Sequence, residues 1–153
     1  MVIHCSATLC SRAYTPEQLE ADHRARGFRK AGYHYYIRKN GDVVRMRPES
    51  EMGAHVKGYN RGSLGICYEG GLDENGQPAD TRTEEQRVAL KELLYRLVCR
   101  YPGVQIVGHR DLSADRNGDG RVSPDEWIKW CPCFDAEVEY AELNELSERL
   151  EAL

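Results

Sequence analysis

The segment IVGHRDLSADRNGDGRVSPDEWIKWCPCFD, residues 106–135, contains most of the residues that decide how this chain folds and what it binds. His109 follows an apolar run, which predicts that it stands at the end of a buried strand. Residues 115–126 have the composition of a calcium loop, and Lys129 and Cys131 follow that loop directly. The segment therefore predicts a metal-binding edge of a sheet with an acidic loop beside it.

The acidic loop is the most specific local motif, because its residues match a calcium loop position by position. Positions 1, 3, 5, 6, 7, 9 and 12 of such a loop are occupied by Asp115, Asn117, Asp119, Gly120, Arg121, Ser123 and Glu126. Side-chain oxygens at positions 1, 3, 5 and 12, a backbone carbonyl at 7 and a glycine at 6 suit Ca²⁺. A solvated acidic turn is the alternative. Residues 109–114 offer no incoming helix, so we expect a structural ion rather than a sensor site.

A second metal site is predicted from residues that lie far apart in the sequence. A catalytic zinc site uses three protein ligands and leaves one position open for water. His4, at the end of the apolar run 1–3, can join His109 and Cys131 in such a site, with Cys133 as the rival of Cys131. Spacing alone leaves open the alternative that each histidine is bonded only to a neighbouring side chain.

Alternating strand and helix signals predict a single α/β domain over residues 1–153. The sequences TPEQ at 15–18 and TEEQ at 83–86 have the form of a helix start, with a capping threonine and a glutamine three residues later. Asn40-Gly41 predicts a two-residue hairpin turn. We expect strands at 1–3, 33–37, 42–46, 63–69 and 104–107, and helices at 15–26, 83–101 and 135–153. The expected architecture is a mixed central β-sheet flanked by helices.

Composition argues against several classes of protein. The net charge of −4 and the pI near 5.8 are unfavourable for nucleic-acid binding, which uses a basic surface. No apolar run approaches the roughly 20 residues of a transmembrane segment. The start MVIHCSATLC has no signal-peptide pattern, so we expect synthesis in the cytoplasm.

The six cysteines do not require a disulfide framework in a chain of this length. Cys67 and Cys99 lie in apolar patterns, and we expect both to be buried as small hydrophobic residues. Cys133 can pair with Cys5 or Cys10 under oxidising conditions, and the sequence does not choose between them.

Six motifs occur in an order that resembles a known family. They are IHCSAT (3–8), GYHYYI (32–37), AHVKGYN (54–60), SLGICYEGG (63–71), GHRDL (108–112) and KWCPCFD (129–135). In this order they resemble the N-acetylmuramoyl-L-alanine amidases, a family that includes amidase-type phage lysozymes and peptidoglycan recognition proteins. The resemblance implies the fold of that family and hydrolysis of the amide between N-acetylmuramic acid and L-alanine in peptidoglycan. The phage-lysozyme branch implies zinc ligation by His4, His109 and Cys131.

The resemblance also implies roles for single side chains. Tyr33 and Lys129 match the catalytic tyrosine and lysine of the phage-lysozyme branch. A packed aromatic side chain and a solvated charge are the respective alternatives. His34, His55 and Asn60 are expected to bind substrate, because two of them lie in a loop that resembles the family's cleft loop.

Phage lysozymes have a short connection where this chain carries residues 115–126, so the calcium loop resembles an insertion that braces Lys129 and Cys131. The expected protein is a monomeric lysis enzyme, such as a prophage endolysin, that acts on the cell wall after release. One alternative is a non-catalytic peptidoglycan-binding receptor of the same fold, although such receptors typically lack the ligand cysteine. The other is a calcium-regulated interaction module, which bound zinc would exclude.

Overall fold

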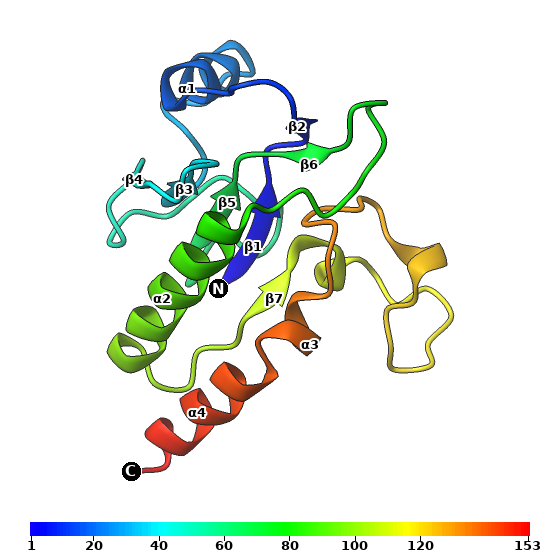
Figure 1. Cartoon of the computed structure of the whole chain (residues 1–153). Helices are drawn as coiled ribbons and strands as arrows, with labels where there is room; N and C mark the ends of the chain where they lie inside the picture. The colour runs from blue at the N-terminus through cyan, green and yellow to red at the C-terminus, as the bar shows by residue number, and fades with distance from the viewer.

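The computed structural model describes the whole chain, residues 1–153, and shows a central sheet with helices packed on both faces (Figure 1). The main sheet has the strand order β4-β3-β5-β1-β7, and β2 and β6 form a small second sheet. The strands are β1 (Val2–Cys5), β2 (Thr8–Leu9), β3 (Tyr35–Ile37), β4 (Val43–Arg45), β5 (Gly65–Tyr68), β6 (Gly71–Leu72) and β7 (Val107–Gly108). The helices are α1 (Pro16–Ala25), α2 (Glu84–Arg100), α3 (Ala136–Glu139) and α4 (Ala141–Glu151), with 3₁₀ turns η1 (His109–Leu112) and η2 (Pro124–Glu126).

Strand β1 lies inside the sheet, where it runs parallel to β5 on one side and to the edge strand β7 on the other. β3 is parallel to β5, and β4 at the edge is antiparallel to β3. Every residue of β1 and β5 is buried, as expected for parallel strands covered on both faces. The predicted α/β fold with a mixed sheet is confirmed.

Side chains alternate between the two faces along β1. Ile3 and Ile66 join the larger core, which also contains the apolar side chains of α2 and part of α4. His4 is paired with Cys67 across the ladder. Cys67 packs in the smaller core with Leu19 of α1. His4 therefore stands on the α1 face of the sheet, away from the larger core.

Both predicted helix starts are confirmed. The Thr15 hydroxyl accepts a hydrogen bond from the backbone N–H of Gln18 at 3.1 Å, and the Thr15 N–H donates to the Gln18 side chain at 2.8 Å. Thr83 and Gln86 form the same capping box at the start of α2. Each box satisfies N–H groups that the first helical turn leaves without a partner, and such a cap contributes about 1 kcal/mol.

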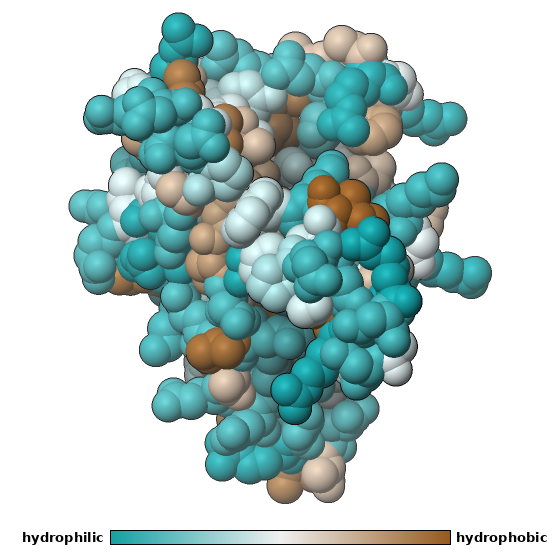
Figure 2. Space-filling model, turned by 90° about the vertical axis from the view of Figure 1, so that its right-hand side faces the viewer, coloured by the Kyte–Doolittle hydropathy of each residue, from teal (hydrophilic) through white to brown (hydrophobic).

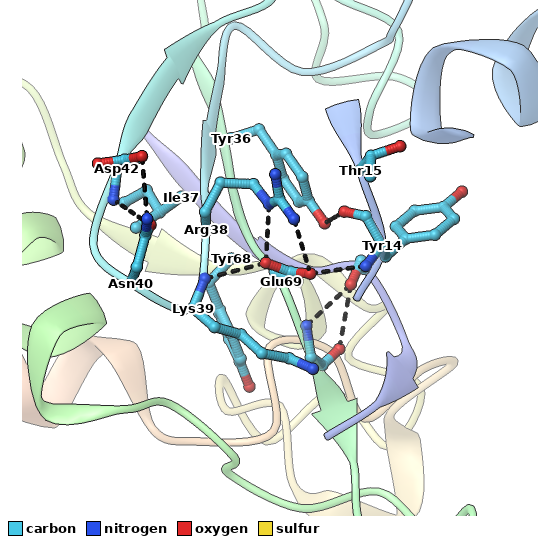
Figure 3. A network of polar contacts seen from close by, with 12 residues as sticks. Tyr14, Thr15, Tyr36, Ile37, Arg38, Lys39, Asn40, Asp42, Tyr68 and Glu69 are labelled. Carbon is cyan, nitrogen blue, oxygen red and sulfur yellow. Dashed lines mark hydrogen bonds and ion pairs between the residues drawn. The ribbon is translucent and has the colours of Figure 1, made fainter. Parts of the chain in front are cut away.

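Glu69, directly after β5, is buried and connects three segments of the chain (Figure 3). Its carboxylate accepts hydrogen bonds from the backbone N–H groups of Tyr14 at 2.6 Å and Lys39 at 2.9 Å, and from the Arg38 guanidinium at 2.9 Å. Burial by itself raises the pKa of Glu69, but these donors outweigh burial and hold the pKa below its ordinary value. The ionised carboxylate thus fastens the β3–β4 turn and the segment before α1 to the end of β5.

The β3–β4 hairpin closes with a longer loop than the one predicted for Asn40-Gly41. The Arg38 N–H donates to the Asp42 carbonyl at 2.8 Å, and the Gly41 N–H donates to the Arg38 carbonyl at 2.9 Å. Gly41 has a positive φ of 91°. A turn that ends in a left-handed glycine is a common three-residue hairpin loop. The prediction of a two-residue turn is wrong, because the glycine serves as the third loop residue.

The expected C-terminal helix is divided into α3 and α4. Asp135 caps α3 by accepting a hydrogen bond from the Val138 N–H at 3.1 Å. The break at Tyr140 orients α3 so that Ala136 and Tyr140 face the larger core. Val138, which lies between these two residues in the chain, is consequently 72% exposed.

Two further expectations are corrected in the second half of the chain. The strand expected at 104–107 pairs only from Val107, because the Asn144 side chain takes both backbone groups of Ile106, at 2.8 and 3.1 Å. Cys67 is buried as predicted, whereas Cys99 is exposed near the end of α2. Helical spacing across α2 was therefore insufficient to place Cys99 on the correct face.

The segment between η1 and α3 projects from the body of the protein beyond β7 (Figure 1). Figure 2 shows the face that carries it, on which hydrophilic side chains predominate and apolar ones are scattered. Ile128 and Trp130 are exposed to 80% and 58%. Among the helices, none combines the length and the apolar character that crossing a membrane requires.

Candidate active site

Three side chains from distant parts of the sequence meet at one end of the sheet. One potential ligand atom each from His4, His109 and Cys131 lies within 4.8 Å of the other two. β1 and β7 pair in register up to Ile3 and Gly108, so the next residues of the two segments, both histidines, are neighbours. Their ring centroids are 4.7 Å apart. The parallel pairing of β1 with β7 therefore creates the two-histidine half of the cluster.

Cys131 is held against β1 and η1 by hydrogen bonds from backbone N–H groups. Its Sγ accepts a hydrogen bond from the Cys5 N–H at 3.2 Å, and its carbonyl accepts one from the Arg110 N–H at 2.9 Å. Pro132 packs so closely on Gly108 that a Cβ there would lie 2.8 Å from the proline Cδ. The glycine before His109 is thus needed for the close approach of the cysteine segment.

The electrostatics of the cluster favour metal ligation. Burial and, to a smaller extent, the nearby cation of Lys129 together lower the pKa of His109 to about 4. Burial also holds the pKa of His4 well below its ordinary value, and the neighbouring His55 and His109 add to this effect. Both imidazoles are therefore neutral at pH 7 and have a lone pair to offer. Two neutral imidazoles and a thiol form a donor set that suits zinc.

A cleft opens beside this cluster, and His55, His109 and Lys129 all line it. Lys129 is exposed, so its ammonium group is free to meet a ligand. The Tyr33 ring packs beside His4, with ring centroids 4.9 Å apart. Burial raises the pKa of Tyr33 well above its ordinary value, so the phenol is protonated at neutral pH.

Comparison with known proteins identifies the family. The sequence pattern of the family described as N-acetylmuramoyl-L-alanine amidase matches residues 1–132. The chain belongs to this family. The endolysin of Klebsiella phage KP32 is 36% identical to the amidase over 144 residues, which are 94% of this chain and 85% of the endolysin. The amidase is accordingly an enzyme of the N-acetylmuramoyl-L-alanine amidase class, and its substrate is peptidoglycan.

Further similarities extend to recognition proteins and to solved structures. Peptidoglycan-recognition protein SD of Drosophila melanogaster is 37% identical over 108 residues, which are 67% of this chain and 55% of that protein. The N-acetylmuramoyl-L-alanine amidase LysC from Clostridium intestinale URNW superposes with a TM-score of 0.71 at 29% identity, covering 94% of this chain and 83% of LysC. The predicted fold is therefore that of the amidase family.

The three residues expected to bind substrate have different positions in the amidase. His34 is fully buried, its Nδ1 accepts a hydrogen bond from the Gly65 N–H at 3.0 Å, and its Nε2 lies 2.8 Å from the Glu51 carbonyl. It cannot reach a ligand, and the prediction of substrate contact is wrong for His34. His55 and Asn60 both line the cleft.

Sequence reasoning missed the environment of His23, which lies in the helix predicted at 15–26. His23 is buried, its Nδ1 accepts a hydrogen bond from the Gly32 N–H at 2.8 Å, and its ring lies 5.4 Å from that of Tyr33. The spacing of four residues from the buried Leu19 was the available signal, since such residues share one face of a helix.

The other two thiols near the cluster have distinct positions. Cys133 is not part of the group formed by His4, His109 and Cys131. Its Sγ lies 3.9 Å from that of Cys5, and both thiols are free. Of the two partners considered for Cys133, the structure thus brings Cys5 into its vicinity.

Proposed function

We propose that the amidase is zinc-dependent and hydrolyses the amide between N-acetylmuramic acid and L-alanine. The observation that carries the proposal is the convergence of one donor atom each from His4, His109 and Cys131 within 4.8 Å, at the edge of a cleft. When bound there, zinc would supply Lewis-acid chemistry, lowering the pKa of a water ligand to about 7 and polarising a carbonyl.

Lys129 is proposed to stabilise the negative charge that develops on the scissile carbonyl oxygen. It lines the same cleft as His109, and its charge already influences the protonation of that histidine. A cation that hydrogen-bonds a developing oxyanion acts more strongly in the transition state than in the ground state, which is the condition for catalysis.

Tyr33 is proposed to manage a proton in the same reaction. Hydrolysis of an amide requires a proton for the departing nitrogen, because an amide anion is a very poor leaving group. The protonated phenol beside His4 can orient the attacking water or transfer a proton towards the departing amine. His55 and Asn60, which line the cleft, are the proposed neighbours of the bound muramyl peptide.

The acidic loop is proposed to bind a structural calcium ion. The Asp115 carboxylate accepts hydrogen bonds from the N–H groups of Gly118 and Gly120 at 3.0 and 2.8 Å. The buried Glu126 carboxylate accepts from those of Asn117 and Ser123 at 3.1 and 3.0 Å. This folding of the loop around its first and last carboxylates supports the assignment of the segment as a calcium loop.

Calcium at this position would act as a brace for the active site. Both ends of the projecting segment are tied together, because the Ile128 N–H donates to the Ser113 hydroxyl at 3.2 Å. The Arg110 guanidinium lies 3.9 Å from the centre of the Trp127 ring and holds that side chain against the body. An ordered loop would therefore limit the positions that Lys129, two residues beyond Trp127, can take.

The proposed place of action is the cell wall, reached after release of a protein made in the cytoplasm, as expected for an endolysin. A receptor without catalysis is less well supported, because the endolysin similarity covers more of the chain than the recognition-protein similarity does. Cys131 also supplies the third ligand that a zinc enzyme needs.

The proposal is tested by measuring the zinc content of the purified amidase and the products of peptidoglycan digestion. We expect one zinc per chain and, by mass spectrometry, free stem peptides that begin with L-alanine. A protein without zinc, or fragments cut within the glycan or the peptide, would overturn the proposal.

A further inference from the structure

We propose that His55 is a positioning residue that sets the tautomer of His4 and leaves Nδ1 of His4 as the nitrogen that binds the metal. This inference rests on the proposed zinc site. It assigns His55 a role towards a ligand residue, in addition to its place in the cleft.

The observation is a continuous chain of polar contacts that ends at His4. The Ser63 hydroxyl lies 2.5 Å from the Tyr59 carbonyl and 3.2 Å from Nε2 of His55. Nδ1 of His55 lies 2.9 Å from Nε2 of His4. Each contact is within hydrogen-bond distance, so one proton must occupy each of the three gaps.

The direction of the chain follows from its first member. A backbone carbonyl only accepts, so the Ser63 hydroxyl must donate its single proton to Tyr59. The Ser63 oxygen then accepts a hydrogen bond, and the donor is Nε2–H of His55. A neutral imidazole carries one proton, which makes Nδ1 of His55 an acceptor for Nε2–H of His4. Nδ1 of His4 is consequently left with a lone pair.

The His55 ring is held in this position by its surroundings. A Cβ on Gly65 would lie 2.7 Å from Cγ of His55, and one on Gly53 would lie 2.7 Å from its Cδ2. The ring thus packs directly on two glycines. Asn60 fixes the backbone at the same point, because its Oδ1 accepts from the N–H groups of His55 and Val56 at 2.7 and 2.9 Å.

The arrangement matches the way proteins support metal-binding histidines. Such histidines commonly donate their second ring N–H to an acceptor, which fixes the tautomer and the ring orientation. Loss of that acceptor typically weakens metal affinity by about 10- to 100-fold. Here the acceptor is a histidine whose own tautomer is set by a serine.

The first test uses the metal-free amidase and does not depend on activity. Long-range ¹H–¹⁵N correlation spectra of the histidine rings near pH 7 report which nitrogen carries the proton. We expect His4 and His55 both to be protonated on Nε2. A proton on Nδ1 of His4 would overturn the inference.

The second test measures zinc affinity by competition with a chromogenic chelator. His55→Leu removes the acceptor, and we expect about 10- to 100-fold weaker zinc binding. His55→Asn places an amide oxygen near the site of Nδ1, and we expect it to recover most of the affinity. His34→Leu is the matched control, because His34 anchors the same loop to β5 without contacting His4.

The outcomes separate this inference from the proposed function. If His55→Leu binds zinc as tightly as the wild type does, the role of His55 is overturned and the proposed zinc site is unaffected. Equal losses in His55→Leu and His34→Leu would assign the effect to loop order and would also overturn the inference. Wild-type protein that fails to bind zinc would overturn the proposed function, while the spectra still decide the tautomer of His4.

Discussion

Replacement of Glu69 by glutamine tests how the segments around the sheet are held together. The substitution keeps the size of the side chain but removes its charge and converts one acceptor oxygen into an NH₂ group. One carboxylate oxygen accepts from the Lys39 N–H, and the other accepts from the Tyr14 N–H. In either orientation of the amide, one backbone N–H therefore faces a donor and loses its partner.

The expected cost follows from these contacts. An unsatisfied buried donor costs about 1–3 kcal/mol. The lost pair with Arg38, whose side chain is 26% exposed, adds at most about 1 kcal/mol. We therefore expect the free energy of unfolding to fall by about 1–4 kcal/mol. For 153 residues the unfolding entropy is about 0.32 kcal/mol per kelvin, so the melting temperature should fall by about 3–12 °C.

The assay is thermal unfolding at several pH values, with Glu74→Gln as the control because Glu74 is exposed. The pKa of Glu69 is lower in the folded protein than its ordinary value, so the ionised group stabilises the fold above about pH 4.3. This contribution is lost as the pH falls through the folded pKa. The difference between wild type and Glu69→Gln should narrow in acid. Coincident melting curves at pH 7, or a difference that persists in acid, would refute the reasoning.

The remaining predictions concern the two metal sites and the catalytic lysine. Cys131→Ser is expected to lose zinc and peptide release, whereas Cys133→Ser keeps both; elemental analysis and chromatography of digested cell walls compare the two. Lys129→Ala is expected to lower kcat by about 100- to 1000-fold at unchanged zinc content, as for loss of an oxyanion donor; a change confined to KM would contradict this role. Glu126→Ala is expected to abolish the rise in melting temperature that calcium produces in the wild type. If calcium does not change the melting temperature of the wild type, the proposal that calcium braces the loop is wrong.

Local signals in the sequence predicted several elements correctly. The capping boxes at Thr15 and Thr83 were predictable because every partner lies within three residues of the cap. The hairpin turn at Asn40-Gly41 was located correctly, but its length was not, because the loop is closed by Arg38 and Asp42 outside the dipeptide.

The burial of a side chain was predictable only where it lies within an uninterrupted strand or helix. Cys67 lies in a strand covered on both faces, so its burial follows from the apolar run. Val138 lies beside the break at Tyr140, and the helix it was assigned to does not continue through that break. Periodicity fails at such points because it presumes one uninterrupted helix.

The assignment of substrate contacts shows a similar limit. His34 and His55 both belong to motifs that the family resemblance singles out. Only the structure separates them, since His34 is enclosed between the loop and β5 whereas His55 lines the cleft. The contact of His55 with His4 spans 51 residues of sequence. No local pattern reports such a contact.

The sequence by itself determined the α/β class and the two capped helices, because these depend on residue type and short-range spacing. The order of the motifs supplied the family, and the resemblance implied His4, His109 and Cys131 as candidate ligands. The tertiary structure decided that β1 and β7 are neighbours, which brings His4 beside His109 and allows Cys131 to complete the group. Strand order and ring orientation depend on packing between distant segments, so only the folded chain specifies them.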